Sequence, residues 1–326
     1  MSSSAASEGA EFSLLTIPVV CGPTASGKSA IASWLSRRRE ILVINADSRQ
    51  IYRGFDIGTA KPTSDEQTRV PHRGVDVVEP TERYSAADWT TLARQAIHEA
   101  TSAGRLPIVV GGTGFYIGAL FRPLWAQPAL DSDRRLATQN ALGELSSDEL
   151  RRWCVALDPA RAHLGRVQLL RAIEVALLTG ERLSELHVAH ARPSAYKPSY
   201  LLVDAGMELP ARIAARAAAM LDAGWSDEVR QLMEAVSPES PAWKATGYEV
   251  VRSHVRGEID RATTLERTII ETRQYAKRQR TWFRHQLGRE RVQPLVFNLP
   301  GWQETVDRWI TEVEEAMGQS GGKQSE

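Results

Sequence analysis

The sequence predicts an α/β fold: a doubly wound parallel sheet built on a phosphate-binding loop (P-loop), with a helical insertion domain and C-terminal helices. Three observations predict it. Residues 22–29 have the spacing G-x-x-x-x-G-K-S and lie between an apolar strand and the start of a helix. Two later apolar stretches also end in turns, and residues 125–192 contain only helical patterns. Strands that alternate with helices are typical of a parallel sheet covered on both faces.

The P-loop follows a β-branched, apolar strand over residues 14–21 and precedes a helix that starts near Ala30. In such a loop the backbone N–H groups surround a diphosphate, the lysine reaches its oxygens and the serine hydroxyl binds Mg²⁺. We therefore expect Ser29 to be the metal ligand. The expected diphosphate-binding residues are Gly22, Thr24, Ala25, Ser26, Gly27, Lys28 and Ser29. The loop alone does not identify the substrate, because kinases, NTPases and other transferases share it.

Two further strands are expected to end beside the P-loop. Residues 41–46 form a buried strand followed by the polar residues 47–50, and residues 106–110 lead into the glycine-rich turn 111–114. Residues 84–103 between them have a helical pattern. In parallel sheets, ligands bind at the carboxyl ends of the strands, so we expect the three strand ends to converge on one site.

The rest of the chain is largely helical, with one more strand at residues 200–204. The predicted helices cover residues 131–145, 147–157, 167–178, 210–222, 248–256 and 260–287. From these patterns we expect a catalytic core over residues 13–124 and 193–315, a helical insertion over 125–192, and tails at 1–12 and 316–326.

The composition is typical of a globular protein with room for about two domains in 326 residues. Forty basic residues balance forty acidic ones, so net charge does not indicate nucleic-acid binding. The two cysteines, Cys21 and Cys154, do not form a disulfide framework or a zinc motif, and we expect both to be small buried residues. No apolar run is long enough to span a bilayer and no signal peptide is evident, which favours a cytoplasmic location.

Three polar residues near the strand ends are candidates for chemistry. Asp47 is a Mg²⁺ ligand, a base for a nucleophile, or a structural cap of the turn that follows it. Thr113 follows two glycines and either donates to a leaving oxygen or forms a local turn bond. Arg216 shares one helix face with Arg212, and it either lies in solvent or points into the site.

Local charge indicates a nucleic-acid partner. Arg273, Lys277, Arg280 and Arg284 are spaced four, three and four residues apart, so they form one stripe on the last long helix. The aromatic residues Tyr275, Trp282 and Phe283 are interleaved with them. A basic face with aromatics suits an RNA backbone and stacked bases, whereas the alternative is a solvated helix face.

The residues alone leave two rival functions open. A nucleoside or small-molecule kinase would explain the P-loop and use the helical insertion as an arginine-bearing lid, but it does not explain the basic C-terminal helix. An NTP-dependent RNA-binding protein without group-transfer chemistry would explain the basic helix, but it gives Asp47 and Thr113 no role.

Several motifs together resemble the tRNA dimethylallyltransferases, also called isopentenyl-tRNA transferases. They occur in order along the chain from about residue 17 to residue 284, and as a set they are specific. They are residues 22–29 (GPTASGKS), 47–52 (DSRQIY), 56–62 (DIGTAKP), 71–73 (PHR), 84–88 (YSAAD), 110–113 (VGGT) with Tyr116, 171–174 (RAIE), 247–248 (GY), 274–279 (QYAKRQ) and 281–282 (TW). No cysteine/histidine zinc finger follows the basic helix, so the resemblance is to the bacterial type.

The resemblance implies transfer of a dimethylallyl group from dimethylallyl diphosphate to N6 of adenosine 37 in tRNA, with Mg²⁺ and with the insertion holding the anticodon stem. Carried over by position, Asp47 would be the general base, and Thr113 and Arg216 would assist the diphosphate leaving group. We expect a monomer. The residues implied to face tRNA are Asp47, Ser48, Arg49, Gln50, Thr113, Arg135, Gln168, Arg171, Lys244, Gly247, Tyr248, Arg273, Gln274, Lys277, Arg278 and Gln279.

Overall fold

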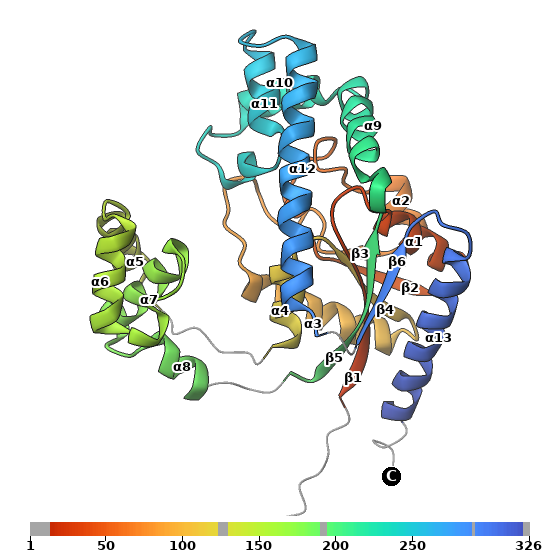
Figure 1. Ribbon diagram of the computed structural model, residues 1–326, viewed down its shortest axis with the longest axis horizontal. Helices are drawn as coiled ribbons and strands as arrows, with labels where there is room; N and C mark the ends of the chain where they lie inside the picture. Colours follow the sequence, from red (N-terminus) through yellow and green to blue (C-terminus); the bar gives the residue numbers. More distant parts are fainter. Residues whose placement is uncertain (1–13, 123–129, 190–193, 289–290, 322–326) are drawn as a thin grey trace, which may run out of the picture. The chain divides into compact units, whose positions relative to one another are not determined.

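The computed structural model describes residues 14–122, 130–189, 194–288 and 291–321 (Figure 1). Its contacts divide the chain into two compact units, one of residues 1–121 and 195–326 and the other of residues 122–194. The expected insertion, residues 125–192, falls inside the second unit. Each unit is described by itself below.

The first unit is built on a six-stranded sheet in the order β3-β2-β4-β1-β5-β6, and every pair of neighbouring strands is parallel. The predicted α/β fold with a doubly wound parallel sheet is therefore confirmed. The strands are β1 (Leu15–Cys21), β2 (Ile41–Asn45), β3 (His72–Arg73), β4 (Leu106–Gly111), β5 (Tyr196–Asp204) and β6 (Val292–Val296).

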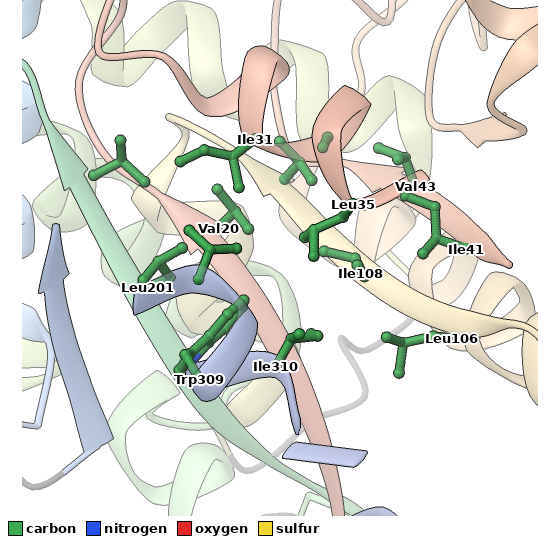
Figure 2. Close-up of a cluster of buried hydrophobic side chains, with 14 of the residues drawn as sticks. Val20, Ile31, Leu35, Ile41, Val43, Leu106, Ile108, Leu201, Trp309 and Ile310 are labelled. Atoms are coloured by element: carbon green, nitrogen blue, oxygen red, sulfur yellow. The ribbon is translucent and has the colours of Figure 1, made fainter. Parts of the chain in front are cut away.

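Helices α1 (Lys28–Ser36) and α13 (Trp302–Gly321) cover one face of this sheet. Figure 2 shows Ile31 and Leu35 of α1 and Ile310 of α13 among the strand residues on that face. Alternate residues of a strand point to opposite faces, so Val20 belongs to this cluster and its neighbours in β1 do not. Burial of this apolar face fixes the position of α1, and with it the P-loop that precedes it.

The opposite face is covered by α3 (Ala86–Ser102) and α4 (Gly114–Phe121). Trp89 is fully buried there, stacks on Tyr116, and donates its indole N–H to the Asn45 carbonyl over 2.8 Å. Phe283, near the end of α12 (Arg261–Gln286), packs into the same cluster. Figure 1 shows α12 in blue, running from α11 to α4.

A third cluster joins the loop after β2 to α9 (Leu209–Asp222), α10 (Trp225–Ala235) and α11 (Tyr248–Val255). Its largest members are Phe55, Trp225 and Tyr248, and all three are at most 1% exposed. Their rings contact one another at centroid distances of 4.8 and 5.3 Å, with Tyr248 in both contacts. This cluster holds the loop of residues 51–60 against the C-terminal helices.

The register of the sheet places four strand ends at one edge. Cys21 of β1 is paired with Gly111 of β4 and Leu202 of β5, and Asn45 of β2 is paired with Val110. The loops that follow β1, β2 and β4 therefore start next to one another, as the sequence predicts. The backbone of Gly111 lies so close to the residue after β2 that a Cβ atom on Gly111 would be 2.2 Å from the Ala46 carbonyl oxygen.

The described residues of the second unit form helices joined by short turns and have their own core of Leu150, Cys154, Leu169 and Ile173, among others. Its helices are α5 (Ser132–Gly143), α6 (Ser147–Leu157), α7 (Arg166–Thr179) and α8 (Leu183–Ala189). Ser146 and Glu149 form a reciprocal capping box at the start of α6, which explains why the helix begins there.

Several elements were not predicted from the sequence. They are α4, α8, α10, α13, β3 and β6, together with α2 (Ser64–Arg69) and the 3₁₀ turns Pro159–Arg161, Gly206–Glu208 and Pro241–Lys244. Strand β6 contains a polar residue and a proline within five residues, so it has no clear alternation, and it is an edge strand paired only with β5. Helix α13 runs to Gly321, which corrects the expected tail from residue 316.

Both cysteines are buried free thiols, as predicted. Burial raises the pKa of Cys21 to about 12, so this thiol stays protonated beside the P-loop. The described residues contain no group of three or more His, Cys, Asp or Glu side chains that could hold a metal ion. They also contain no helix long and apolar enough to cross a membrane.

The close approach at Gly111 generates a stability prediction. We expect Gly111→Ala to lower the free energy of unfolding by about 1–3 kcal/mol, because the new methyl group would overlap the backbone of the neighbouring strand end. Gly143→Ala is the matched control, since no heavy atom lies within 4 Å of its would-be Cβ. Denaturant unfolding measures both variants, and equal stability of the two would contradict the steric constraint.

Candidate active site

The P-loop has a strained, glycine-dependent conformation held against β5 and the residue after β6. Gly22 and Gly27 have φ angles of 147° and 109°, and Ala25 has a φ of 60°. A Cβ atom on Gly22 would lie 2.0 Å from the Val203 carbonyl oxygen, and one on Gly27 would lie 2.5 Å from the Phe297 ring. Only glycine fits these two positions, so the loop shape is fixed by its surroundings as well as by its sequence.

Two long side chains tie the P-loop to the C-terminal helices. Arg212 of α9 donates from Nε to the Ala25 carbonyl over 2.9 Å, and its guanidinium carbon lies 5.1 Å from the centre of the Phe297 ring. Gln279 of α12 accepts a hydrogen bond of 2.8 Å from the Thr24 N–H. Arg212, one of two candidates on α9, therefore supports the loop.

Lys28 lies within the loop and faces the other charged groups of the site. Its ammonium donates to the Pro23 carbonyl over 2.7 Å. Burial lowers its pKa to about 8; the Asp47 carboxylate partly offsets that effect, while Arg216 adds to it. The charges of Lys28, Asp47 and Arg216 are thus close enough to influence one another, and an incoming anion would stabilise the two cations.

Asp47 follows β2 and lines the cavity at the strand ends. Its Oδ1 accepts a hydrogen bond of 2.9 Å from the Arg49 N–H, so the aspartate also caps the turn, one of the roles considered for it. Arg216 lines the same cavity; burial lowers the pKa of its guanidinium and Asp47 raises it in part. The structure therefore brings together two of the three predicted catalytic residues in one cavity.

Thr113, the third, lies beside this cavity. Its hydroxyl oxygen accepts a 3.0 Å hydrogen bond from the Ser48 N–H, and it also shares a hydrogen bond with the Tyr275 side chain. Tyr275 lines the cavity. Burial, followed by the negative charge of Asp47, raises its pKa to about 12, so it is a neutral phenol at physiological pH. Tyr275 therefore bonds to Thr113 and lies close enough to Asp47 to be influenced by its charge.

The cavity runs between α9 and α12. Along α9 it is lined by Ile213, Arg216, Ala217 and Met220, and along α12 by Thr268, Thr272 and Tyr275. Trp225, Ala245 and Thr246 line it as well. The lining residues of each helix have helical spacing, so they lie on one face of it. The charged groups gather near Asp47, and the other walls are largely apolar.

The loop of residues 52–61 beside the cavity is held by charged side chains, of which Lys61 is buried. Glu228 of α10 accepts hydrogen bonds from the N–H groups of Asp56 and Ile57 over 3.1 and 2.6 Å, and from the Tyr248 hydroxyl over 2.7 Å. Lys61 donates to the Tyr52 carbonyl over 2.6 Å and pairs with two aspartates, Asp56 and Asp76. Sequence reasoning assigned no role to Glu228, because α10 was not predicted.

Ser29 lies in the first turn of α1 and is exposed. It does not line the cavity of Asp47; it lines a second cavity with Asn45 and Gln50. Its hydroxyl is an oxygen ligand of the kind that Mg²⁺ prefers. A single protein ligand is sufficient, because water and substrate phosphate oxygens usually complete the octahedral coordination of Mg²⁺. The donor set at the P-loop therefore fits Mg²⁺ bound together with a diphosphate.

The basic face of α12 differs from the predicted stripe. Arg273, Gln274, Lys277 and Arg278 are exposed, as is Arg284. Arg280 instead pairs with Asp204 at the end of β5, with a distance of 2.8 Å from Nε to Oδ2. Phe283 is buried in the core and Trp282 packs over Gly114, which corrects the expected role of these aromatics in base stacking.

Other residues expected to face tRNA are engaged inside the protein. Tyr248 is fully buried and bonded to Glu228, and Gln279 is only 6% exposed. Gly247 donates its N–H to Glu271 over 3.0 Å, and a Cβ there would lie 2.5 Å from the Trp225 ring. Gln50 donates to two loop carbonyls over 3.0 Å. Lys244 is exposed, and Ser48 and Arg49 are half-exposed.

In the second unit, two of the expected tRNA-facing arginines pair with one buried carboxylate. Arg135 and Arg171 contact Glu174 over 2.7 and 2.6 Å, and Gln139 adds a hydrogen bond of 2.8 Å. Burial would raise the pKa of Glu174, but these hydrogen bonds outweigh it and lower the pKa. Gln168 is exposed on α7.

Comparison with known proteins identifies the group to which this architecture belongs. The family model described as IPP transferase matches residues 50–286. The chain belongs to this IPP transferase family. A tRNA dimethylallyltransferase from Anaeromyxobacter sp. (strain K) is 41% identical over 280 residues, which cover 84% of this chain and 92% of that protein. The family expected from the sequence motifs is thereby confirmed.

Solved structures agree with this membership. The full-length tRNA isopentenylpyrophosphate transferase from Bacillus halodurans matches with a TM-score of 0.66 and 28% identity, over 95% of this chain and 99% of that one. A eukaryotic dimethylallyltransferase described as acting on tRNA matches with a TM-score of 0.75 and 25% identity, over 90% of this chain and 77% of that one.

The structure adds site residues that sequence reasoning did not assign in this IPP transferase chain. Tyr275 was counted with the basic helix, yet it lies two residues from Arg273 and therefore on a different face. Ile213, Ala217 and Met220 share the helix face of Arg216, so their spacing was the available signal. The Trp225 ring packs against Gly58 and Gly247, and a Cβ atom at either glycine would lie within 2.5 Å of the ring. These two glycines were the sequence signal for a bulky neighbour.

The position of Lys28 predicts a pH dependence for anion binding. A bound diphosphate favours the ammonium form, so above the free pKa of about 8 the protein must take up a proton to bind. Lys28→Arg is the reference, because arginine stays protonated over this pH range. We expect the ratio of the two pyrophosphate dissociation constants, wild type over Lys28→Arg, to be constant below about pH 7 and to rise about tenfold by pH 9. Calorimetric titration measures both constants. A ratio that is flat throughout would contradict the lowered pKa.

Proposed function

We propose that this chain transfers a dimethylallyl group from dimethylallyl diphosphate to N6 of adenosine 37 in tRNA, forming N6-dimethylallyladenosine. It is an enzyme of the prenyltransferase class. The observation that carries the detailed proposal is the meeting of Lys28, Asp47 and Arg216 beside the P-loop, at one end of a cavity with apolar walls. That arrangement suits an anionic leaving group attached to a small hydrocarbon.

The donor would bind with its diphosphate on the P-loop and its hydrocarbon in the cavity. The loop N–H groups and the Lys28 ammonium suit the diphosphate oxygens. Ser29 would hold Mg²⁺, which when bound neutralises part of the negative charge on the diphosphate. Ile213, Ala217 and Met220 offer an apolar wall to the allyl carbons and keep water from them.

Asp47 would act as the general base. The exocyclic amine of adenine is a weak nucleophile, so a carboxylate must take its proton as the new bond forms. The N6–C1 bond forms while the C1–O bond to the diphosphate breaks. The N6 proton passes to the Asp47 carboxylate, and the electron pair of the broken bond leaves on the diphosphate oxygen. Lys28 and Arg216 stabilise the charge that develops on that oxygen.

Thr113 and Tyr275 would orient this machinery. The Thr113 hydroxyl bonds the Ser48 backbone directly after Asp47, and Tyr275 connects Thr113 to the cavity. The hydroxyl groups thereby restrict the turn that carries the base. This assignment differs from a direct contact of Thr113 with the leaving group.

The acceptor would be the anticodon stem-loop of tRNA. A base inside a cavity must leave its stack, which costs a few kcal/mol and favours a single-stranded loop over a duplex. Exposed Arg273, Lys277, Arg278 and Arg284 supply positive charge on α12 for the RNA backbone. We further propose that the chain acts as a monomer in the cytoplasm, where tRNA is modified.

A transfer assay tests the proposed reaction. Radiolabelled dimethylallyl diphosphate is incubated with Mg²⁺, unmodified tRNA and the protein, and label in the RNA is counted and mapped. We expect label at adenosine 37, and we expect Asp47→Asn to reduce the transfer rate about 10²- to 10⁴-fold. The same variant should bind pyrophosphate and tRNA within about two-fold of the wild type, because the amide keeps the size and the turn bond of the carboxylate. Turnover of ATP without label in RNA would favour a kinase instead.

Two cations on α12 separate RNA binding from stability. Lys277 is exposed, whereas Arg280 pairs with Asp204. We expect Lys277→Met to weaken tRNA binding and to lower the salt slope by about 0.7–0.9, because one phosphate contact is lost. Arg280→Met should instead lower the melting temperature and leave the slope nearly unchanged. Filter binding between about 50 and 200 mM salt measures the slope. Equal slopes for Lys277→Met and the wild type would show that Lys277 does not contact an RNA phosphate.

A further inference from the structure

Gln279 is a buried amide at the centre of the site, although its helix presents a basic outer face. It is 6% exposed. Its Oε1 accepts a hydrogen bond of 2.8 Å from the Thr24 N–H in the P-loop, and its Nε2 donates one of 2.9 Å to the Gly112 carbonyl after β4. These two partners lie 88 residues apart in the chain. One side chain of α12 therefore joins the two loops that flank the site.

The contact needs the chemistry of an amide. An N–H donor and a carbonyl acceptor face each other across the gap, so the bridging group must accept at one end and donate at the other. The carboxamide of glutamine does both without charge. Gly112 must lack a side chain for the bridge to form, because a Cβ there would lie 2.3 Å from Gln279 Nε2.

The two bonds hold the groups that the reaction would use. The Thr24 bond directs one N–H of the P-loop toward Gln279, and so fixes which N–H groups remain for a diphosphate. The Gly112 bond anchors the turn that carries Thr113, whose hydroxyl is bonded to Ser48 and Tyr275. Gln279 lies four residues after Tyr275 on the same helix, so α12 supplies both the cavity wall and the bridge.

We infer that Gln279 is a positioning residue of the diphosphate site, which acts by holding the P-loop and the Thr113 turn at a fixed separation. The inference deepens the proposed function and rests on it only for the transfer reaction, because diphosphate binding by the P-loop is measured without transfer. A direct contact of Gln279 with tRNA is the alternative, and it conflicts with the burial and with the use of both ends of the amide.

The first experiment compares Gln279→Met with Gln274→Met. Gln274 lies on the same helix but is exposed. Methionine keeps the length of the side chain and removes both hydrogen bonds. We expect Gln279→Met to weaken pyrophosphate binding with Mg²⁺ at least about tenfold, because two buried polar groups lose their partner, and to change the tRNA dissociation constant less than about two-fold. Gln274→Met should leave pyrophosphate binding unchanged. Unchanged pyrophosphate affinity of Gln279→Met, or a loss confined to tRNA binding, would overturn the inference.

The second experiment uses Gln279→Glu, which keeps the shape of the side chain and tests the bridge itself. An ionised glutamate accepts from Thr24 N–H but repels the Gly112 carbonyl, whereas a protonated one donates to that carbonyl and restores both bonds. We expect pyrophosphate affinity of this variant, relative to the wild type at each pH, to recover as the pH falls toward about 5. A purely structural role would lower the melting temperature without this recovery. A relative affinity that does not change with pH would overturn the bridge.

Discussion

Parallel pairing of β1 with β4 on one side and β5 on the other is the constraint on which the rest of the site depends. Cys21 and Gly111 end β1 and β4 in register, and Asn45, the end of β2, pairs with Val110, so the chain leaves these three strands at nearly the same height and enters three neighbouring loops. A register shift of one residue in any pair would turn the apolar side chains of a strand from one covered face to the other. The apolar clusters on both faces therefore enforce the geometry of the polar edge.

The polar edge concentrates positive charge that has little to balance it inside the protein. Lys28 and Arg216 both have lowered pKa values because of burial, and Asp47 is the one carboxylate among the described residues that offsets both. A site with surplus buried positive charge is less stable when empty than when an anion is bound. Binding energy and folding energy are thus linked at the P-loop, whose backbone is held by Arg212 of α9 and Gln279 of α12.

Local sequence was sufficient for the P-loop, the first strands and the long helices, because glycine spacing and apolar runs determine them directly. It was not sufficient where one residue has to be assigned to one face. The resemblance places five residues between 273 and 279 on the tRNA side, yet a helix makes nearly two turns over seven residues, and Gln279 faces the interior. Tyr248 shows a similar difference: the resemblance places it with exposed Lys244 on the tRNA side, although its ring completes a core cluster with Trp225, which lies on a helix that was not predicted from the sequence.

The carboxylate of Glu174 has a consequence for the proposed contact between the helical insertion and tRNA. Arg135 and Arg171 lose rotational freedom when this unit folds, because Glu174 holds one edge of each guanidinium. A guanidinium has five N–H donors, and the contact of Arg135 with Glu174 uses its Nε. The entropy of ordering these two long side chains is therefore lost during folding, and under the proposed function a tRNA phosphate would meet cations already in place.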